Sequence, residues 1–344
     1  MASEKHLLVI RMSAMGDVAM TVPVLLALQQ QHPQLKITVL TRAFFKPLFS
    51  QLKNVHVYEA DVKGKHKGVL GLYQLYKELK SLKIDAVADL HNVLRSKILK
   101  FYFSSGGIPV VQIDKGRGEK KDLTAAKNKK FIPLKTTHQR YADVFNVIGF
   151  PVVLKKTPLL AKEPLSKNTQ EILGTVTKKR IGIAPFAAFS GKMYPLLLME
   201  QVVENLAASG KYTIILFGGG QKEKETLALW QNKFKNTLNV SGKFSFQEEL
   251  SLISQLDVML AMDSGNAHLA ANYNIPVVTL WGVTHPYAGF YPFGQPSENA
   301  LLSDRHKYPL IPTSIYGNKF PEGYENVMET ISPASIIAKI EELV

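Results

Sequence analysis

The chain has 344 residues, of which 46% are hydrophobic and 20% are charged, and it contains no cysteine. This composition predicts a globular protein large enough for two domains, and the lack of cysteine excludes disulfides, thiolate metal sites and a thiol nucleophile. The formal net charge of +14 predicts an anionic partner: nucleic acid, an acidic membrane surface or a phosphorylated substrate.

Strand and helix patterns alternate in the first 155 residues. Short apolar runs typical of buried strands are followed by longer runs with helical periodicity, in a βαβ rhythm. This rhythm predicts a parallel sheet with helices on both faces. The expected strands cover 6–12, 36–41, 55–60 and 85–90, and the expected helices cover 17–31, 70–82 and 140–150.

A segment rich in Lys, Thr and Pro, residues 156–179, is interpreted as an interdomain linker. The βα rhythm then returns and fades after Pro286, before a last helix that begins at the Ser332 N-cap. Its expected strands cover 180–186, 212–220, 258–262 and 276–282, and its expected helices cover 195–209 and 222–234. The predicted parts are an N-terminal domain over 1–155, the linker over 156–179, a C-terminal domain over 180–331 and a C-terminal helix over 332–344.

Ligands of open parallel sheets bind beyond the carboxyl ends of the strands, where loops lead into helices. Asp17 follows the first expected strand, and its position suits either a helix N-cap or a catalytic base. Ser190 and Lys192 lie in a polar loop after the strand over 180–186. Lys192 is interpreted either as a phosphate-binding side chain or as a solvated surface charge.

Three consecutive glycines, Gly218, Gly219 and Gly220, follow another strand and would let a ligand approach the backbone. They do not form the G-x-G-x-x-G fingerprint, and Walker A, H-E-x-x-H, G-x-S-x-G and D-x-D motifs are absent as well. An enzyme of this sequence that cleaves a nucleotide diphosphate would neutralise its leaving group with lysine and helix dipoles. We therefore expect no metal and no cofactor.

The stretch "MDSGNAHLAA" lies between a buried strand and a short Ala-rich helix. Backbone N–H groups at Ser264 and Gly265, together with the Ser264 hydroxyl, predict an anion site at the start of that helix. His268 would face the same anion from the first turn. The alternative is structural, with Asp263 as a helix cap and His268 as a buried core residue.

Positive charge is concentrated between 114 and 140, where nine Lys or Arg stand against three acidic residues. Such a run is typical either of a surface that docks on an anionic partner or of a solvated loop.

Taken together in their order, these motifs resemble glycosyltransferase family 9, the bacterial heptosyltransferases of lipopolysaccharide core assembly. The resemblance spans almost the whole chain and implies a GT-B architecture, with two doubly wound Rossmann-like domains facing across a cleft. It also implies that the last helix packs back toward the N-terminal domain. The matching segments are "MGDVAMTVPVL", "DLHNVLRSK", "HQRYADVFNVIG", "FSGKMYP", "LFGGGQKE", "MDSGNAHLAA", "VVTLWGVTHP" and "VMETISPASIIAKIEEL".

The resemblance implies an inverting transfer of heptose from ADP-heptose to a lipid A or inner-core acceptor, without a cofactor. Asp17 would be the general base, and Lys192 would bind the donor diphosphate. The other implied donor-binding residues are Ser190, Gly218, Gly219, Gly220, Asp263, Ser264, Gly265 and His268, and the implied acceptor-binding residues are Arg95, Lys120, Lys121 and Arg140.

The implied location is cytoplasmic and peripheral, at the inner face of the inner membrane. Apolar runs are too short to span a bilayer, and Arg11 interrupts the first one too early for a signal peptide. Lysines of the 114–140 stretch would dock the protein on anionic lipid, and their alternative interpretation is a mobile solvated loop.

The chain departs from the family at Tyr194, where members commonly have Trp, at its missing C-terminal cysteines and over 287–325, which matches weakly. Three other functions are considered: a nucleotide-sugar epimerase on a GT-B-like scaffold, a non-catalytic nucleotide binder and a basic nucleic-acid-binding protein. No helix-turn-helix, RNP-type or zinc motif accompanies the positive charge, so no nucleic acid is expected.

Overall fold

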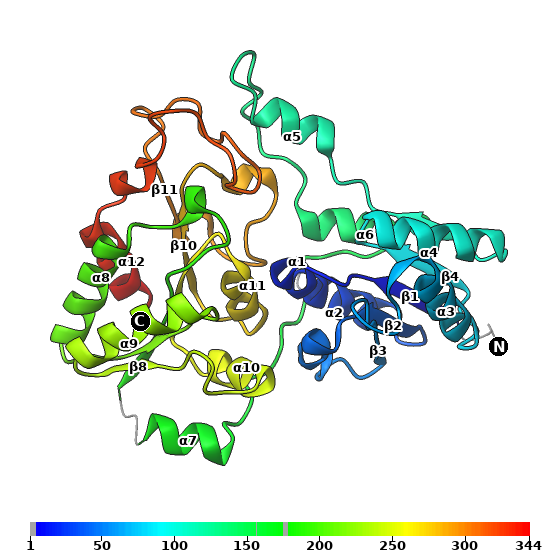
Figure 1. The fold of residues 1–344 in the computed structure, drawn as a ribbon, viewed down its shortest axis with the longest axis horizontal. Coiled ribbons are helices and arrows are strands. Elements are labelled where there is room, and N and C mark those ends of the chain that lie inside the picture. Colours follow the sequence, from blue (N-terminus) through cyan, green and yellow to red (C-terminus); the bar gives the residue numbers. More distant parts are fainter. Residues whose placement is uncertain (1–4, 156, 175–177) are drawn as a thin grey trace. The chain divides into compact units, whose positions relative to one another are not determined.

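A computed structural model describes residues 5–155, 157–174 and 178–344. The chain forms two compact units (Figure 1). The first unit contains Met1–Lys115 and Thr137–Leu159, and the second contains Gly116–Thr136 and Leu160–Val344. Each unit is built on a wholly parallel sheet, which confirms the predicted α/β class.

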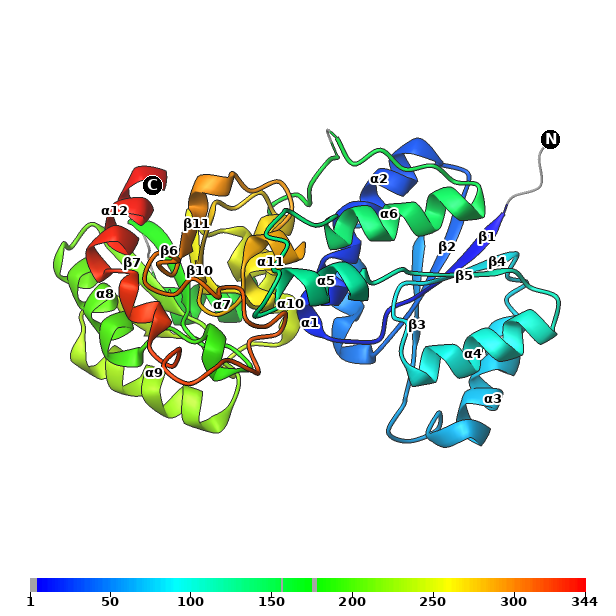
Figure 2. The same cartoon turned by 90° about the horizontal axis from the view of Figure 1, so that it is seen from above.

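The sheet of the first unit has the order β3-β2-β1-β4-β5. Helices α2 and α6 cover one of its faces, and α3 and α4 cover the other (Figure 2). Every residue of the central strand β1 is buried, as expected for a strand covered on both faces. The elements are β1 (His6–Ile10), α1 (Met15–Ala19), α2 (Thr21–Gln31), β2 (Lys36–Thr41), β3 (Val55–Glu59), α3 (Gly68–Lys80), β4 (Ala86–Asp89), α4 (Leu94–Ser105), β5 (Val110–Gln112) and α6 (Thr137–Ile148).

Two helices of this unit differ from expectation. The helix expected over 17–31 is interrupted at Met20, and Pro23 lies in the first turn of α2, where its missing N–H costs nothing. Helix α4 is not predicted at all. Its exposed Leu94 and Phe101 obscure the apolar periodicity from which an amphipathic helix is recognised.

The sheet of the second unit has the order β11-β10-β9-β6-β7-β8. Side chains of α8, α9 and α12 form one large core with its strands, and α10 and α11 contact each other beside β9 and β10. The elements are β6 (Lys179–Ala184), α8 (Leu196–Ala208), β7 (Tyr212–Leu216), α9 (Gln221–Lys233), β8 (Thr237–Asn239), α10 (Phe246–Ser254), β9 (Val258–Met262), α11 (Gly265–Asn272), β10 (Val277–Trp281), β11 (Ala300–Leu302) and α12 (Pro333–Leu343).

The C-terminal helix α12 uses its apolar face within the second unit. Ile336 and Ile340 are fully buried in the core shared with α8 and the strands. These contacts place the buried face of α12 against the C-terminal unit, and the packing toward the N-terminal domain that the resemblance implies stays a prediction. The burial of this face has a local reason, since both isoleucines lie on the single apolar stripe that the helix offers.

The segment Gly116–Thr136, predicted within the N-terminal domain, belongs to the second unit. It contains α5 (Arg117–Leu123) and an extended stretch that we call the strap, residues 125–136. The amide of Leu134 donates to the carbonyl of Tyr287, and the Lys129 ammonium donates to the carbonyl of Pro312. The boundaries of the two domains are therefore not contiguous in sequence.

Much of the expected linker is ordered on the second unit. It contains a short helix, α7 (Lys167–Leu173), whose N-cap Ser166 also donates to the Glu248 carboxylate at 2.8 Å. The amide of Leu160 donates to the carbonyl of Asn272. The linker residues 156 and 175–177 lie outside the described residues. Among the helices of the described ranges, none combines the length and apolarity needed to cross a bilayer.

Candidate functional site

Polar side chains converge at the carboxyl edge of the second sheet. Lys192 follows β6, Asp263 follows β9, and Thr284 follows β10. The Lys192 Nζ lies 3.4 Å from Oδ2 of Asp263, and the Thr284 hydroxyl donates to the same oxygen at 3.0 Å. The Lys192 and Asp263 side chains are only 15% and 9% exposed. Two loops predicted separately from the sequence thus meet in one partly desolvated ion pair, and a third loop, which is not predicted, adds Thr284.

Glycines allow these loops to approach each other. A Cβ at Gly282 would lie 2.3 Å from the carbonyl oxygen of Gly191, and a Cβ at Gly191 would lie 2.6 Å from the carbonyl oxygen of Gly317. Gly317 has a φ of 77° and packs on the Lys192 stem, where a Cβ would lie 2.3 Å from Cγ. These contacts leave no room for a side chain at any of the three positions, and they direct Lys192 toward Asp263.

The start of α11 provides hydrogen-bond donors beside Asp263. Ser264 has an extended backbone, and its hydroxyl does not cap the helix. That hydroxyl is buried and has no hydrogen-bond partner among the described residues. His268 is buried one turn further along the helix. The free amides of Gly265 and its neighbours, with the helix dipole, make this turn suitable for an anion.

The three consecutive glycines after β7 are not equivalent. A Cβ at Gly218 would lie 2.9 Å from Leu227, so this position is required for packing. Gly219 has nothing within 4 Å of its would-be Cβ and is open to a ligand. The amides of Gly219 and Gly220 donate to the Glu223 carboxylate at 2.7 and 3.3 Å. Glu223, which the sequence analysis does not single out, therefore occupies two backbone amides of the glycine run that was expected to approach a ligand.

Tyr194 anchors the loop that carries Lys192. Its ring is fully buried, and its hydroxyl donates to the carbonyl of Ile331 at 2.6 Å. Burial raises the pKa of this hydroxyl to about 12, so it stays protonated. The tyrosine that stands where family members commonly have tryptophan is thus buried with its polar end hydrogen-bonded.

Asp17 lies at the carboxyl edge of the first sheet, in the short helix α1. Its Oδ2 is 2.5 Å from Nη2 of Arg11 and accepts the amide of Ala14 at 3.3 Å. Arg11 is buried and also donates to the carbonyl of Leu90 at 2.7 Å, so the guanidinium is fixed. The Asp17 side chain remains 29% exposed. A carboxylate held by a buried cation and still open to solvent is suited to accept a proton.

A histidine at the same edge is not predicted from the sequence. His91 follows β4, and its Nε2 lies 3.4 Å from the Ser13 hydroxyl. Burial and the nearby Arg11 charge lower the pKa of His91 to about 4, so the ring is neutral at pH 7. Asp89 holds the turn by accepting the amides of His91 and Asn92 at 2.9 and 3.0 Å. The position of "LHN" directly after a buried strand is the signal that would have indicated it.

The four expected acceptor-binding residues are divided between the units. Arg95 is exposed at the start of α4, and Arg140 is buried in α6 with its Nη1 3.7 Å from Asp114. Lys120 and Lys121 lie on α5, which belongs to the second unit, and Lys120 stacks over the Phe290 ring at 4.3 Å.

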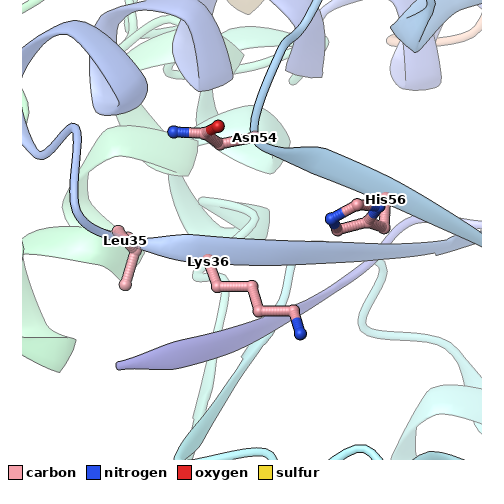
Figure 3. A pocket seen from close by; sticks show the side chains of 4 residues that line it. All are labelled: Leu35, Lys36, Asn54 and His56. Carbon is pink, nitrogen blue, oxygen red and sulfur yellow. The ribbon is translucent and has the colours of Figure 1, made fainter. Parts of the chain in front are cut away.

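A hollow at the opposite edge of the first sheet does not belong to this site. It is lined by Leu35, Lys36, Asn54 and His56 (Figure 3). These residues lie at the amino ends of β2 and β3, whereas Asp17 and His91 follow carboxyl ends.

Comparison with known proteins found a matching family and similar proteins. A model of glycosyltransferase family 9 (heptosyltransferase) matches residues 72–312. Lipooligosaccharide heptosyltransferase 2 of Haemophilus influenzae is 28% identical over 362 aligned positions, which cover 98% of this chain and 99% of that protein.

Two solved structures are similar over both units. A glycosyl transferase family 9 protein from Veillonella parvula has a TM-score of 0.75 at 20% identity and covers 100% of this chain and 98% of that one. The heptosyltransferase WaaC of E. coli, solved with ADP, has a TM-score of 0.68 at 18% identity and covers 98% and 100%. These similarities confirm the predicted GT-B class with two Rossmann-like units.

The close approach of the glycine loops leads to a stability prediction. Gly282→Ala would force a Cβ against the Gly191 carbonyl, and we expect the free energy of unfolding to fall by about 1–3 kcal/mol in urea titrations. Gly219→Ala is the matched control, because its Cβ meets open space, and it should be neutral. Equal stability of the two variants would contradict the proposed packing.

The buried His91 leads to a pH prediction. Its folded pKa of about 4 lies below the usual 6.5, so between these values the unfolded chain binds a proton that the folded protein excludes. Stability should therefore fall as the pH drops from 6.5 toward 4. We expect His91→Gln to reduce this fall, as measured by urea unfolding at pH 7 and pH 5. Burial also lowers the pKa of His285 to about 4, so His285→Gln should reduce the fall in stability in the same direction. An unchanged pH dependence in His91→Gln would refute the assignment.

Proposed function

Because the chain belongs to glycosyltransferase family 9 and is therefore a glycosyltransferase, we propose that it transfers a heptose from ADP-heptose to a lipopolysaccharide inner-core acceptor, with inversion. The observation that carries this proposal is the Lys192–Asp263–Thr284 cluster beside the start of α11. It joins a cation, a carboxylate and free amide donors at the carboxyl edge of one sheet. This combination of groups suits a sugar attached to a diphosphate.

In the proposed donor complex, Lys192 and the amides at the start of α11 bind the diphosphate. Ser264 adds its hydroxyl, and His268 and Ser190 lie on neighbouring turns of the same edge. These groups stabilise the negative charge that develops as the bond between the anomeric carbon and the diphosphate breaks. Asp263, oriented by Thr284, hydrogen-bonds hydroxyls of the sugar through the oxygen that the threonine does not use.

The nucleoside approaches at Gly219, the open position of the glycine run. Gly218 and Gly220 act by shaping the backbone on either side. ADP as the nucleotide is supported by the E. coli relative, whose structure contains it. Neither a cofactor nor a metal is part of the proposal.

In the proposed transfer step, Asp17 is the general base. The acceptor oxygen attacks the anomeric carbon on the face opposite the diphosphate, its proton passes to the Asp17 carboxylate, and ADP leaves. Arg11 keeps the carboxylate oriented before the proton arrives. His91 is neutral at pH 7 and adds no further positive charge beside Arg11.

The acceptor carries phosphates and carboxylates, so basic side chains are proposed to bind it. Arg95 and Lys121 are exposed, and the half-buried Lys120 lies next to Lys121 on α5. Arg140 is buried and acts by positioning its neighbours. The enzyme is proposed to work at the cytoplasmic face of the inner membrane, where the acceptor is embedded. Family membership favours this activity over an epimerase or a nucleic-acid-binding protein.

The proposed function is tested first by donor binding. We expect ADP-heptose to bind more tightly than UDP- or GDP-sugars in isothermal titration, and heptose to appear on a deacylated core acceptor by mass spectrometry. Lys192→Ala should lower kcat by about 10²–10³, the effect of losing one preorganised donor. Lys319→Ala, an exposed lysine of the neighbouring loop, is the matched control and should retain activity. Failure of every ADP-sugar to bind would overturn the proposal.

The role of Asp17 is tested separately. Asp17→Asn keeps the shape of the side chain and removes its basicity, so we expect turnover to be lost while the dissociation constant for ADP stays unchanged. Asp61→Asn, an exposed carboxylate in the same unit, should leave both quantities unchanged. Full turnover by Asp17→Asn would rule out Asp17 as the general base.

A further inference from the structure

Large apolar side chains are exposed on the two helices that cover one face of the first sheet. On α3, Leu70 is 85% exposed, and Val69 and Tyr73 are also exposed. On α4, Phe101 is 67% exposed. The two helices lie side by side (Figure 2). The rings of Tyr73 and Tyr102 meet edge to face with centroids 5.3 Å apart. We call the outer side of this pair the α3–α4 surface. Exposed apolar patches on a folded protein commonly mark an interaction site.

The α3–α4 surface is surrounded by positive charge. Residues 63–80 and 94–105 contain eight Lys or Arg and a single acidic residue, Glu78. Glu78 is neutralised locally, because its carboxylate pairs with Lys65 at 2.7 Å. The basic residues are Lys63, Lys65, Lys67, Lys77, Lys80, Arg95, Lys97 and Lys100. A partner for this surface must therefore be apolar at its centre and anionic around it.

The surface is held firmly by its own unit. Glu78 also accepts from the Tyr58 hydroxyl and contacts His66 Nε2 at 3.2 Å, which ties the loop before α3 to the helix. A Cβ at Gly71 would lie 2.5 Å from the His66 backbone, so the loop packs directly on the first turns of α3. Val69 and Leu70 are thus presented on a supported turn.

Part of the stretch expected to dock on lipid, residues 114–140, makes internal contacts, although Arg117, Lys121, Lys127 and Lys135 are exposed. Lys129 donates to two carbonyls, and burial together with Arg305 lowers its pKa to about 8. Lys130 pairs with Asp122 at 2.8 Å, and Phe131 of the strap stacks under Arg305 at 3.4 Å. These charges serve the fold of the second unit.

We propose that the α3–α4 surface docks this protein on a bilayer that contains anionic lipid. Leu70, Val69 and Phe101 enter the boundary between headgroups and acyl chains, while the surrounding lysines bind lipid phosphates. The apolar side chains at the centre match the acyl chains of a bilayer, and the positive charge around them matches its anionic headgroups. The inference rests on the proposed function, because an enzyme whose acceptor is a membrane lipid must work at that interface.

The proposal is tested by co-sedimentation with phosphatidylcholine vesicles with and without about one third phosphatidylglycerol. We expect binding only with phosphatidylglycerol, and weakening as salt rises. The double variant Leu70→Asp, Phe101→Asp should reduce the partition coefficient about tenfold or more, since it removes both apolar anchors and adds negative charge. Lys77→Glu with Lys97→Glu should reduce it similarly at low salt.

Matched variants lie on the second unit. Leu229 is 69% exposed on α9, and Leu229→Asp should not change vesicle binding. Lys121→Glu with Lys127→Glu on the 114–140 stretch should have the smaller effect. Retained binding by the Leu70→Asp, Phe101→Asp variant, or greater loss from Lys121→Glu with Lys127→Glu, would overturn the proposal.

The lack of cysteine allows a direct probe of depth. A single cysteine introduced as Phe101→Cys and labelled with an environment-sensitive dye should show a blue shift on the vesicles, whereas Leu229→Cys should not. A shift at both positions or at neither would contradict the proposal. It would also be contradicted if the unsubstituted protein sedimented as a dimer without vesicles and the Leu70→Asp, Phe101→Asp variant as a monomer.

Failure of the membrane-docking proposal can be distinguished from failure of the proposed function. Vesicle binding needs no donor, and transfer to a deacylated, water-soluble acceptor needs no membrane. The Leu70→Asp, Phe101→Asp variant should therefore keep its turnover on the soluble acceptor.

Discussion

The candidate donor site depends on one steric constraint, the close approach of three backbone segments through Gly191, Gly282 and Gly317. Because no side chain fits there, the loops after β6 and β10 lie in direct contact, and Lys192 extends toward Asp263 in an environment with little water. Charge interactions are stronger in such surroundings than at an open surface. The pair at 3.4 Å is therefore a sensitive element: an incoming diphosphate would compete for the lysine, and Thr284 would still hold the carboxylate.

In the first unit, the feature of interest is the ion pair that holds the Asp17 carboxylate. In the proposed transfer step, Asp17 must be accessible to a substrate hydroxyl and must also be held in place. Buried Arg11, fixed by the carbonyl of Leu90, provides a rigid partner on the protein side, while the carboxylate is open on the other. Neutral His91 sits beside this pair without adding charge. Both units thus orient a carboxylate through a buried partner, Arg11 for Asp17 and Thr284 for Asp263.

The basic side chains behind the net charge of +14 have three different roles. Some cations are internal, such as Arg11 and Lys129, and hold carbonyls or carboxylates in place. Lys192 faces the candidate site. Among the remaining cations, eight lie in residues 63–80 and 94–105, the segments of α3 and α4, and others, such as Lys121 and Lys222, are exposed on the second unit. Total charge alone therefore says little about a partner, because a buried, hydrogen-bonded lysine contributes to the sum and not to the surface.

Local features of the sequence determined the βα rhythm, the two parallel sheets and the placing of Asp17, Lys192 and Ser264 after strands, because periodicity and turn chemistry act over a few residues. Tertiary structure alone decided that Gly116–Thr136 joins the second unit, that Glu223 occupies the amides of the glycine run and that the apolar face of the last helix is buried in the second unit. Each of these outcomes is a competition between partners far apart in the chain or between rival acceptors. Which partner is bound depends on tertiary geometry that no short stretch of sequence contains.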